Sequence, residues 1–293
     1  MQTISPYEKL KSGISDYLIS RGFSEEDTRG FISDIPKKWE KFADVALLPN
    51  RSFKDEKWNE HRKELCSIIA DSLGVKRIGR IGEIIGKRRE STVEILLGDD
   101  DWVIRKENGI NYGYRFCKCM FSAGNVNERR RMGEVGRSGD IVVDLYAGIG
   151  YYSLPMLVFS EIAHMHSCEW NYESIKALRI NLERNNVSDR CTIHEGDNRI
   201  TTEKLRNIAD RVILGLLPTA EDGYIPALDV LKKKGVLHIH GIAPAKDYDS
   251  WISKTLEGIS IIRPKSKISE IGRYRIKSYA PHWDHLVIDV RVE

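Results

Sequence analysis

The 293-residue chain lacks a long apolar run and any leader-like segment. No stretch approaches the ~18 uninterrupted apolar residues that a membrane-spanning helix needs. Its first residues, MQTISPYEKLKSG, contain neither the apolar stretch nor the small-residue cleavage site of a signal peptide. We therefore expect a cytoplasmic protein that makes no use of a membrane.

Cysteine is also scarce, and it forms no metal-binding pattern. The five cysteines are scattered, and the closest pair, Cys117 and Cys119, has the wrong spacing for a zinc knuckle and no second pair nearby. Because a cytoplasmic protein is expected, the thiols are expected to be reduced. The sequence predicts no structural metal.

Excess charge is slight, at a formal +3, but the basic residues are unevenly placed. One cluster lies between positions 76 and 90, and a run of three arginines follows at 129–131. Such clusters can bind phosphates, or they can form a solvated, salt-bridged surface, and charge alone does not decide between these interpretations. The candidate phosphate-binding residues in the first cluster are Lys76, Arg77, Arg80, Lys87, Arg88 and Arg89.

Three segments with different residue patterns predict three modules. With 41% apolar and 30% charged residues the chain is globular. Residues 1–70 have mostly helical spacing, and residues 71–133 form a basic α+β module of short β-rich runs separated by turns. In residues 134–293 strands and helices alternate, which predicts an α/β fold with a doubly wound, mostly parallel sheet. The last two strand-like runs, RYRIKSY and HLVIDVRV, predict an antiparallel addition at the sheet edge.

The stretch VVDLYAGIG at 142–150 predicts a cofactor loop at the end of the first strand of this sheet. Glycines at 148 and 150 allow the backbone to come close to a ligand. A dinucleotide-binding loop needs a third glycine at position 153, which is Ser153 here. The form Asp144-x-x-x-Gly148-x-Gly150 instead resembles the S-adenosylmethionine loop of class I transferases, although many α/β proteins carry a similar turn.

Polar residues at the next two strand ends strengthen this interpretation. Glu169 lies 19 residues after Gly150, close to the ~20-residue offset at which an acidic side chain meets a ribose. The third strand end contributes Asp197 and Asn198, which could bond an adenine. The alternative is that Glu169 is a surface charge and Asp197 a turn residue. Three strand ends in register favour the cofactor site.

Several stretches resemble the tRNA wybutosine-synthesising protein 2 family, which is related to the tRNA guanine-N1 methyltransferases. The resemblance runs from about residue 76 to the end, through KCMFSAGNVNER, DLYAGIGYYSLP, CEWN, DRCTIHEGDNR, ADRVILGLLPTAEDG, LHIHG and KSYAPHWDHLVIDV. It implies transfer of the 3-amino-3-carboxypropyl arm of S-adenosylmethionine to C7 of 4-demethylwyosine, next to the anticodon of tRNA(Phe). Methylthioadenosine would be released.

The resemblance also implies site residues, and it makes the basic cluster at 76–90 the candidate tRNA-binding residues. Cofactor contacts would be Ser122, Arg129, Glu169, Asp197 and Asn198. Arg129 would hold the methionine carboxylate, although it could instead bind phosphate as one of three arginines.

The fourth strand end separates this family from its methyltransferase relatives. Enzymes that methylate base nitrogens commonly place Asn or Asp beside a proline there, whereas this chain reads LGLLP, ending at Leu217 and Pro218. These two residues are expected to position a carbon acceptor, and no catalytic base is assigned. The alternatives are a tRNA guanine-N1 methyltransferase and a non-catalytic RNA-binding protein. We expect a monomer.

Overall fold

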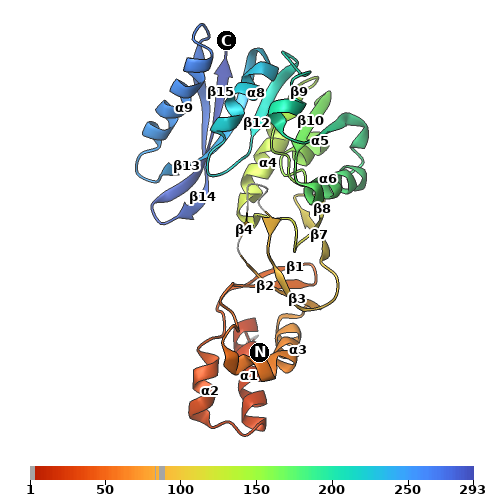
Figure 1. Ribbon diagram of the computed structural model, residues 1–293, viewed down its shortest axis with the longest axis vertical. Helices are drawn as coiled ribbons and strands as arrows, with labels where there is room; N and C mark the ends of the chain where they lie inside the picture. The colour runs from red at the N-terminus through yellow and green to blue at the C-terminus, as the bar shows by residue number, and fades with distance from the viewer. Residues whose placement is uncertain (1–3, 83, 86–89) are drawn as a thin grey trace. The chain divides into compact units, whose positions relative to one another are not determined.

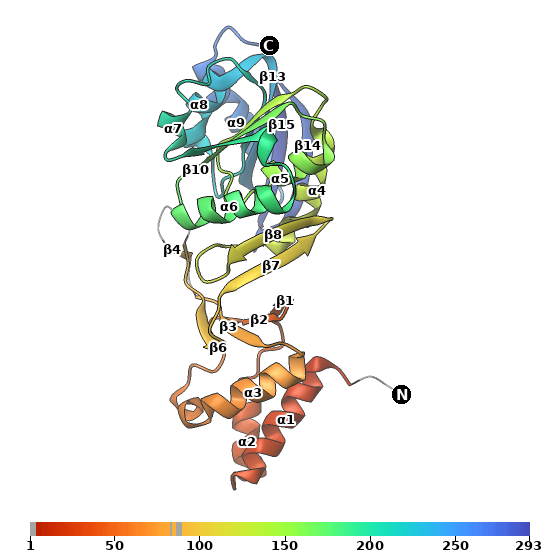
Figure 2. The ribbon, with the colours of Figure 1, turned by 90° about the vertical axis from the view of Figure 1, so that its right-hand side faces the viewer.

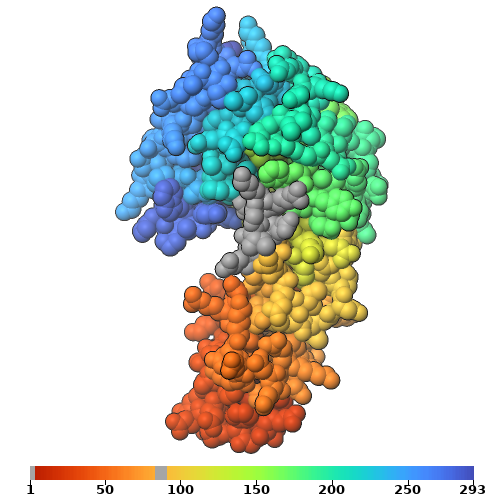
Figure 3. Space-filling view, in the orientation of Figure 1, coloured from red at the N-terminus to blue at the C-terminus, as the bar shows by residue number. Residues whose placement is uncertain are grey.

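The computed structural model describes the chain except for residues 1–3, 83 and 86–89 (Figure 1). Its contacts form two units. Unit 1 comprises Met1–Arg105 and Arg115–Met120, and unit 2 comprises Lys106–Tyr114 and Phe121–Glu293. Figure 3 shows the chain as a space-filling surface, with the N-terminal helices of unit 1 in red and the C-terminal strands of unit 2 in blue. The three modules predicted from the sequence use other boundaries and stay a prediction.

The helices of unit 1 begin and end at residues suited to caps. Helix α1 (Pro6–Ser20) starts with proline, and Ser5 Oγ accepts a hydrogen bond from the Glu8 amide at 3.2 Å. Helix α2 (Glu25–Ile32) is followed by the 3-10 helix η1 (Glu56–His61) and by α3 (Arg62–Leu73). Gly74, at φ +61°, ends α3 in the left-handed conformation that favours glycine. The apolar sides of these helices share one core, which includes Trp58.

Short strands complete unit 1. Its four-stranded sheet has the order β1-β2-β3-β6. The strands are β1 (Glu40–Phe42), β2 (Val45–Leu48), β3 (Arg77–Arg80) and β6 (Glu94–Leu97). A separate pair joins β4 (Ile84–Ile85) to β5 (Glu90–Ser91).

A hairpin of β7 (Trp102–Glu107) and β8 (Ile110–Arg115) contributes strand residues to both units. Asn108 and Gly109 form its two-residue turn at φ +50° and +83°. Positive φ at both positions suits a type I′ turn, for which Asn-Gly is the preferred sequence.

Unit 2 is built on a seven-stranded sheet of order β11-β10-β9-β12-β13-β15-β14 (Figure 2). The neighbours from β11 to β13 pair in parallel, while β15 pairs antiparallel with both β13 and β14. The predicted doubly wound sheet with an antiparallel addition is therefore confirmed. The strands are β9 (Ile141–Asp144), β10 (His164–Glu169), β11 (Cys191–Glu195), β12 (Ala209–Leu214), β13 (Leu231–Pro244), β14 (Ile268–Ala280) and β15 (Trp283–Val292).

Helices precede and connect these strands along the chain. They are α4 (Val126–Val135), α5 (Ser153–Phe159), α6 (Tyr172–Arg184), α7 (Asn198–Thr201), α8 (Tyr224–Val230) and α9 (Tyr248–Ile262), with 3-10 turns η2 (Ala123–Asn125), η3 (Ser188–Arg190) and η4 (Glu221–Gly223). Leu228 of α8 and Ile259 of α9 share an apolar core with β12, β13 and β15. Asn171 caps α6 by accepting the Glu173 amide at 3.0 Å. This packing holds the carboxyl ends of β9, β10 and β11 in one line, which positions the candidate site.

Candidate cofactor site

The loop after β9 needs both of its predicted glycines. Gly148 lies at φ +57° and Gly150 at φ +99°, where residues with side chains are strained. A Cβ on Gly148 would also lie 2.5 Å from the ring of Tyr151. The loop can therefore keep this tight path only with glycine at these positions.

Asp144, at the end of β9, stabilises this loop through hydrogen bonds to its first residues and to α5. Its side chain is fully buried, and its carboxylate accepts hydrogen bonds from Ser153 Oγ at 2.9 Å and from the Tyr146 amide at 3.2 Å. Burial raises the pKa of Asp144 to about 7. Because the carboxylate does not reach the surface, we correct the expected direct ligand contact to an indirect role in shaping the loop.

The structure brings Glu169, at the end of β10, together with the glycine loop. Its Oε2 accepts the Gly148 amide at 2.7 Å, and its Oε1 accepts the Trp170 and Asn171 amides at 2.9 Å and 2.7 Å. Burial raises the pKa of Glu169, and these three backbone donors oppose that shift. The carboxylate is thereby fixed beside the loop, as a ribose-binding side chain would need to be.

The third strand end also reaches the loop. Asn198 donates from Nδ2 to the carbonyl of Leu145 at 2.8 Å. Its neighbour Asp197 begins α7 by accepting the Arg199 amide at 3.0 Å and also pairs with the Arg199 guanidinium. The ends of β10 and β11 thus both bond directly to the loop after β9, through Glu169 and Asn198. Asp197 is the residue before Asn198.

Arg129 lies in a different environment from the one expected. The residue is buried, and Nε and Nη2 donate to the two oxygens of Glu107 at 2.5 Å and 2.8 Å. Nη1 donates to the carbonyl of Ser122 at 2.9 Å, and the guanidinium lies 4.6 Å from the ring centroid of Phe121. The structure therefore joins Arg129 to Ser122, as predicted cofactor neighbours would be, but it also gives Arg129 a carboxylate partner within the protein.

The fourth strand end approaches the glycine loop through packing. A Cβ on Gly215 would lie 2.8 Å from the ring of Tyr152, two residues after Gly150 of the loop. The Pro218 carbonyl accepts the Ile242 amide at 3.1 Å, and Pro218 itself is exposed after a cis peptide bond from Leu217. An apolar edge thus lies close to the loop, and its predicted role in positioning the acceptor stays a prediction.

The basic cluster is only partly available for RNA. Lys76 is exposed, but Arg77 pairs with Asp44 at 2.6 Å and donates to the Trp102 carbonyl at 2.6 Å. Arg80 is buried and pairs with Glu94 at 2.5 Å. Since these guanidinium groups compensate charges within unit 1, the prediction that Arg77 and Arg80 contact tRNA is corrected. Lys87, Arg88 and Arg89 lie outside the described residues.

Sequence reasoning missed a buried polar network between α4, β13 and β15. Arg131 donates to Asp289 at 2.8 Å and to Glu128 at 2.7 Å, and His238 Nδ1 lies 2.6 Å from Asp289. Burial raises the pKa of Asp289, but His238 and Arg131 outweigh it and hold that pKa well below its usual range. Glu128 and Arg131 lie on one helix, but Asp289 follows Arg131 by 158 residues and His238 lies 51 residues from Asp289, so no local pattern indicated the network.

The histidines on these strands are structural. His238, His240 and His285 are buried, and the last two approach each other at 3.0 Å between Nδ1 and Nε2.

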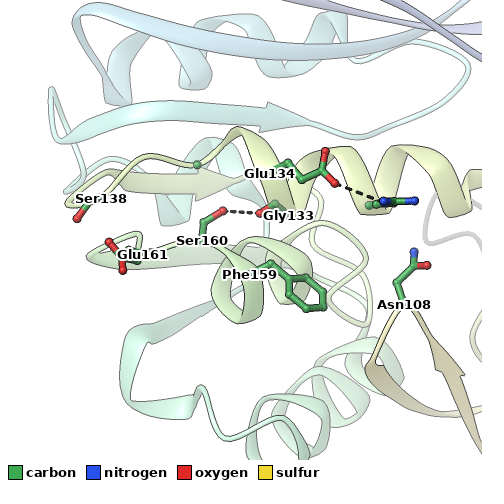
Figure 4. Close-up of a pocket in the computed structure, with 9 residues that line it drawn as sticks. Asn108, Gly133, Glu134, Ser138, Phe159, Ser160 and Glu161 are labelled. Atoms are coloured by element: carbon green, nitrogen blue, oxygen red, sulfur yellow. Dashed lines mark hydrogen bonds and ion pairs between the residues drawn. The ribbon is translucent and has the colours of Figure 1, made fainter.

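A pocket of about 810 Å³ lies elsewhere in unit 2 (Figure 4). Phe159 and the hydrogen bond from Ser160 Oγ to the Gly133 carbonyl form part of its wall. Its residues 136–138 and 160–161 precede β9 and β10, so it lies at the amino ends of these strands. Ligands in open α/β sheets bind at the carboxyl ends. None of the predicted site residues lines this pocket, and it is not the candidate site.

Two further observations concern the described residues alone. Nowhere among them do three or more His, Cys, Asp or Glu side chains group in a way that could hold a metal ion. No helix in this described part of the chain is both long and apolar enough to cross a membrane.

The fold and the site together define a class. A seven-stranded sheet with one antiparallel strand inserted next to its edge, a glycine loop after β9 and an acidic side chain after β10 are the features of class I S-adenosylmethionine-dependent transferases.

Comparison with known proteins places the chain within this class. Residues 103–263 match the TRM5/TYW2 methyltransferase domain, and residues 19–101 match the TYW2 N-terminal domain. The chain belongs to the TYW2 branch of the TRM5/TYW2 family.

Individual relatives and a solved structure are similar to this chain over most of its length. A "tRNA wybutosine-synthesizing protein 2 homolog" of Danio rerio is 38% identical over 98% of this chain and 78% of its own length. The "tRNA wybutosine-synthesizing protein 2/3/4" of Arabidopsis thaliana is 41% identical over 98% of this chain, which spans only 29% of that protein. The crystal structure of P. horikoshii TYW2 in complex with MeSAdo has a TM-score of 0.77 and 31% identity, covering 96% of this chain and 98% of its own.

Proposed function

We propose that this chain transfers the 3-amino-3-carboxypropyl group of S-adenosylmethionine to C7 of 4-demethylwyosine in tRNA(Phe). Support comes from membership of the TYW2 branch and from the relatives named as wybutosine-synthesising proteins. The P. horikoshii relative was crystallised with MeSAdo, which is methylthioadenosine, the product expected of this transfer. The chain spans 29% of the length of the Arabidopsis protein, so the proposal concerns the activity of this chain and not that of the whole Arabidopsis protein.

The observation that carries the proposal is the apolar fourth strand end beside the glycine loop. Leu214, Leu216 and Leu217 precede Pro218, so no polar side chain there can bond a base nitrogen. An electron-rich ring carbon needs positioning more than hydrogen bonding. Alignment of a reacting pair is worth ~7–11 kcal/mol, enough to select one of the three carbons bound to sulfur.

The chemistry needs no covalent enzyme intermediate. The acceptor carbon attacks the methylene that joins the arm to sulfur, the carbon–sulfur bond breaks, and its electron pair stays on sulfur in neutral methylthioadenosine. The ring carbon then loses its proton. What the protein supplies is orientation.

Each candidate residue has a part in this arrangement. Glu169 holds the ribose, and Asp197 and Asn198 hold the adenine. The two glycines let the backbone of the loop come close to the cofactor. Ser122 and Arg129 belong to the amino-acid end of the cofactor. Leu217 and Pro218 shape the base pocket. The contacts of these groups with one another support the assignment.

The transferred group is tested with two labels. Purified protein and tRNA bearing 4-demethylwyosine are incubated with S-adenosylmethionine labelled in either the methyl or the carboxyl carbon. We expect the carboxyl label to enter the tRNA and methylthioadenosine to be released. Entry of the methyl label with release of S-adenosylhomocysteine would instead identify a methyltransferase, and entry of neither label would count against any transfer to this tRNA.

RNA binding by the basic module is tested through the salt dependence of affinity. Replacing exposed Lys76 by Ala should lower the slope of log affinity against log salt by about 1, because one phosphate contact is lost. Its melting temperature should not change. Replacing buried Arg80 by Ala should do the reverse, destabilising unit 1 through loss of the Glu94 pair. An unchanged slope for Lys76→Ala would remove this residue from the RNA-binding surface.

We further propose that the enzyme is cytoplasmic and monomeric.

A further inference from the structure

The guanidinium expected to bind the cofactor carboxylate is already paired. Arg129 makes a two-point contact with Glu107 and a third bond to the Ser122 carbonyl, and its side chain is 2% exposed. A paired guanidinium and carboxylate have no net charge to offer a second carboxylate. The α-carboxylate of S-adenosylmethionine therefore needs another cation.

Lys277 of β14 is a cation placed at the same point. Its Nζ donates to Ser122 Oγ at 2.6 Å, and its side chain is half-buried. Burial and the neighbouring Arg129 cation both lower the pKa of Lys277. Among the described residues, Lys277 makes no salt bridge within 4.0 Å. A half-buried ammonium held without a counter-charge attracts an anion.

A glycine makes room for this lysine. A Cβ on Gly124 would lie 2.8 Å from Lys277 Cδ and 3.2 Å from Nζ. Gly124 does not have positive φ, so backbone conformation does not require glycine there. The close approach of the lysine side chain accounts for it instead.

A series of contacts links the lysine to the cofactor loop. Ser122, to which Nζ donates, is next to Phe121, whose ring centroid is 5.8 Å from that of Tyr151. Tyr151 directly follows Gly150 of the loop. The adenosine end of the cofactor is assigned to Glu169 and Asn198, so the segment around Ser122 is where its amino-acid arm would extend.

We propose that Lys277, together with the Ser122 hydroxyl, binds the α-carboxylate of the S-adenosylmethionine arm, while Arg129 holds the Ser122 backbone in place. Lys277 is then a positioning residue that turns the arm, and with it the methylene carbon, towards the acceptor. This inference rests on the proposed use of S-adenosylmethionine.

Three ligands separate the arm from the nucleoside. S-adenosylmethionine and S-adenosylhomocysteine carry the α-carboxylate, whereas methylthioadenosine does not. Calorimetric titration of Lys277→Met should show affinity for the first two reduced about 10- to 100-fold, since a charge-assisted bond is lost. Affinity for methylthioadenosine should be unchanged, which also shows that the variant is folded. Gly124→Ala, which displaces the lysine, should give the same pattern in weaker form.

Lys254→Ala is the matched control, because that side chain is 77% exposed on α9. It should change none of the three affinities. If Lys277→Met weakened all three ligands equally, or none of them, the carboxylate role would be wrong. Retained S-adenosylmethionine affinity with lost transfer would likewise overturn it in favour of a role in the chemical step. If the unaltered protein bound none of the ligands, the proposed function itself would fail, and this inference with it.

Discussion

Replacing Arg129 by Met is expected to lower the free energy of unfolding by about 3–5 kcal/mol, because it leaves the Glu107 carboxylate without its buried partner. The Arg129 side chain is 2% exposed and that of Glu107 14% exposed, so water can compensate the lost contact only poorly. Urea unfolding, followed by circular dichroism, measures the change. A loss of less than about 1 kcal/mol would show that the pair is solvated and the buried arrangement is wrong.

Two controls separate this effect from the general loss of an arginine. Arg130, the next residue of α4, pairs with Glu134 at 3.4 Å, and these side chains are 73% and 66% exposed. Arg130→Met should change stability by no more than about 0.5 kcal/mol, as exposed pairs do. The double variant with Met at both 129 and 107 should recover much of the loss, since apolar residues can replace a buried pair. A double variant as unstable as Arg129→Met alone would mean that Glu107 is not the partner that matters.

The sequence was sufficient to predict the features that depend on local order. Strand–helix alternation predicted the parallel sheet, and the spacing of Asp144, Gly148 and Gly150 predicted the loop. Glu169 was found by its offset along the chain. These predictions succeed because a parallel sheet brings consecutive strand ends to one edge, so that chain order maps directly onto space.

Partners distant in the chain could not be predicted in this way. Glu107 lies on the β7–β8 hairpin, 22 residues before Arg129, and neither residue has a local pattern that indicates the other. The pairing depends on how the hairpin packs on unit 2. Lys277 is 155 residues from Ser122 and escaped notice for the same reason.

The prediction of RNA contacts from clustered charge was wrong for residues whose side chains are paired within the protein. Arg77 and Arg80 fall in a basic stretch, yet β3 lies between β2 and β6 in its sheet, where Arg80 is enclosed. Linear charge density does not distinguish a guanidinium that faces solvent from one that binds Glu94.

Stability should also depend on pH through Asp144. Its pKa is about 7 in the folded chain and about 3.9 in an unfolded one, so the folded state binds the extra proton between these values. A raised carboxyl pKa means that its contribution to stability is full below pH 4 and is lost as the pH rises to 7. The shift corresponds to roughly 3–5 kcal/mol.

Asp144→Asn isolates this contribution, because asparagine keeps the shape of the side chain and does not titrate. The free energy of unfolding of the unaltered protein, minus that of the variant, should fall by roughly 3–5 kcal/mol between pH 4 and pH 8. Asp249→Asn, whose side chain is 81% exposed, should show a difference that does not vary with pH. If the Asp144→Asn difference were equally flat, the carboxylate would be ionised throughout. The loop would then be held by an anion that its Ser153 and Tyr146 bonds fully stabilise, and the burial of Asp144 would carry no energetic penalty at neutral pH.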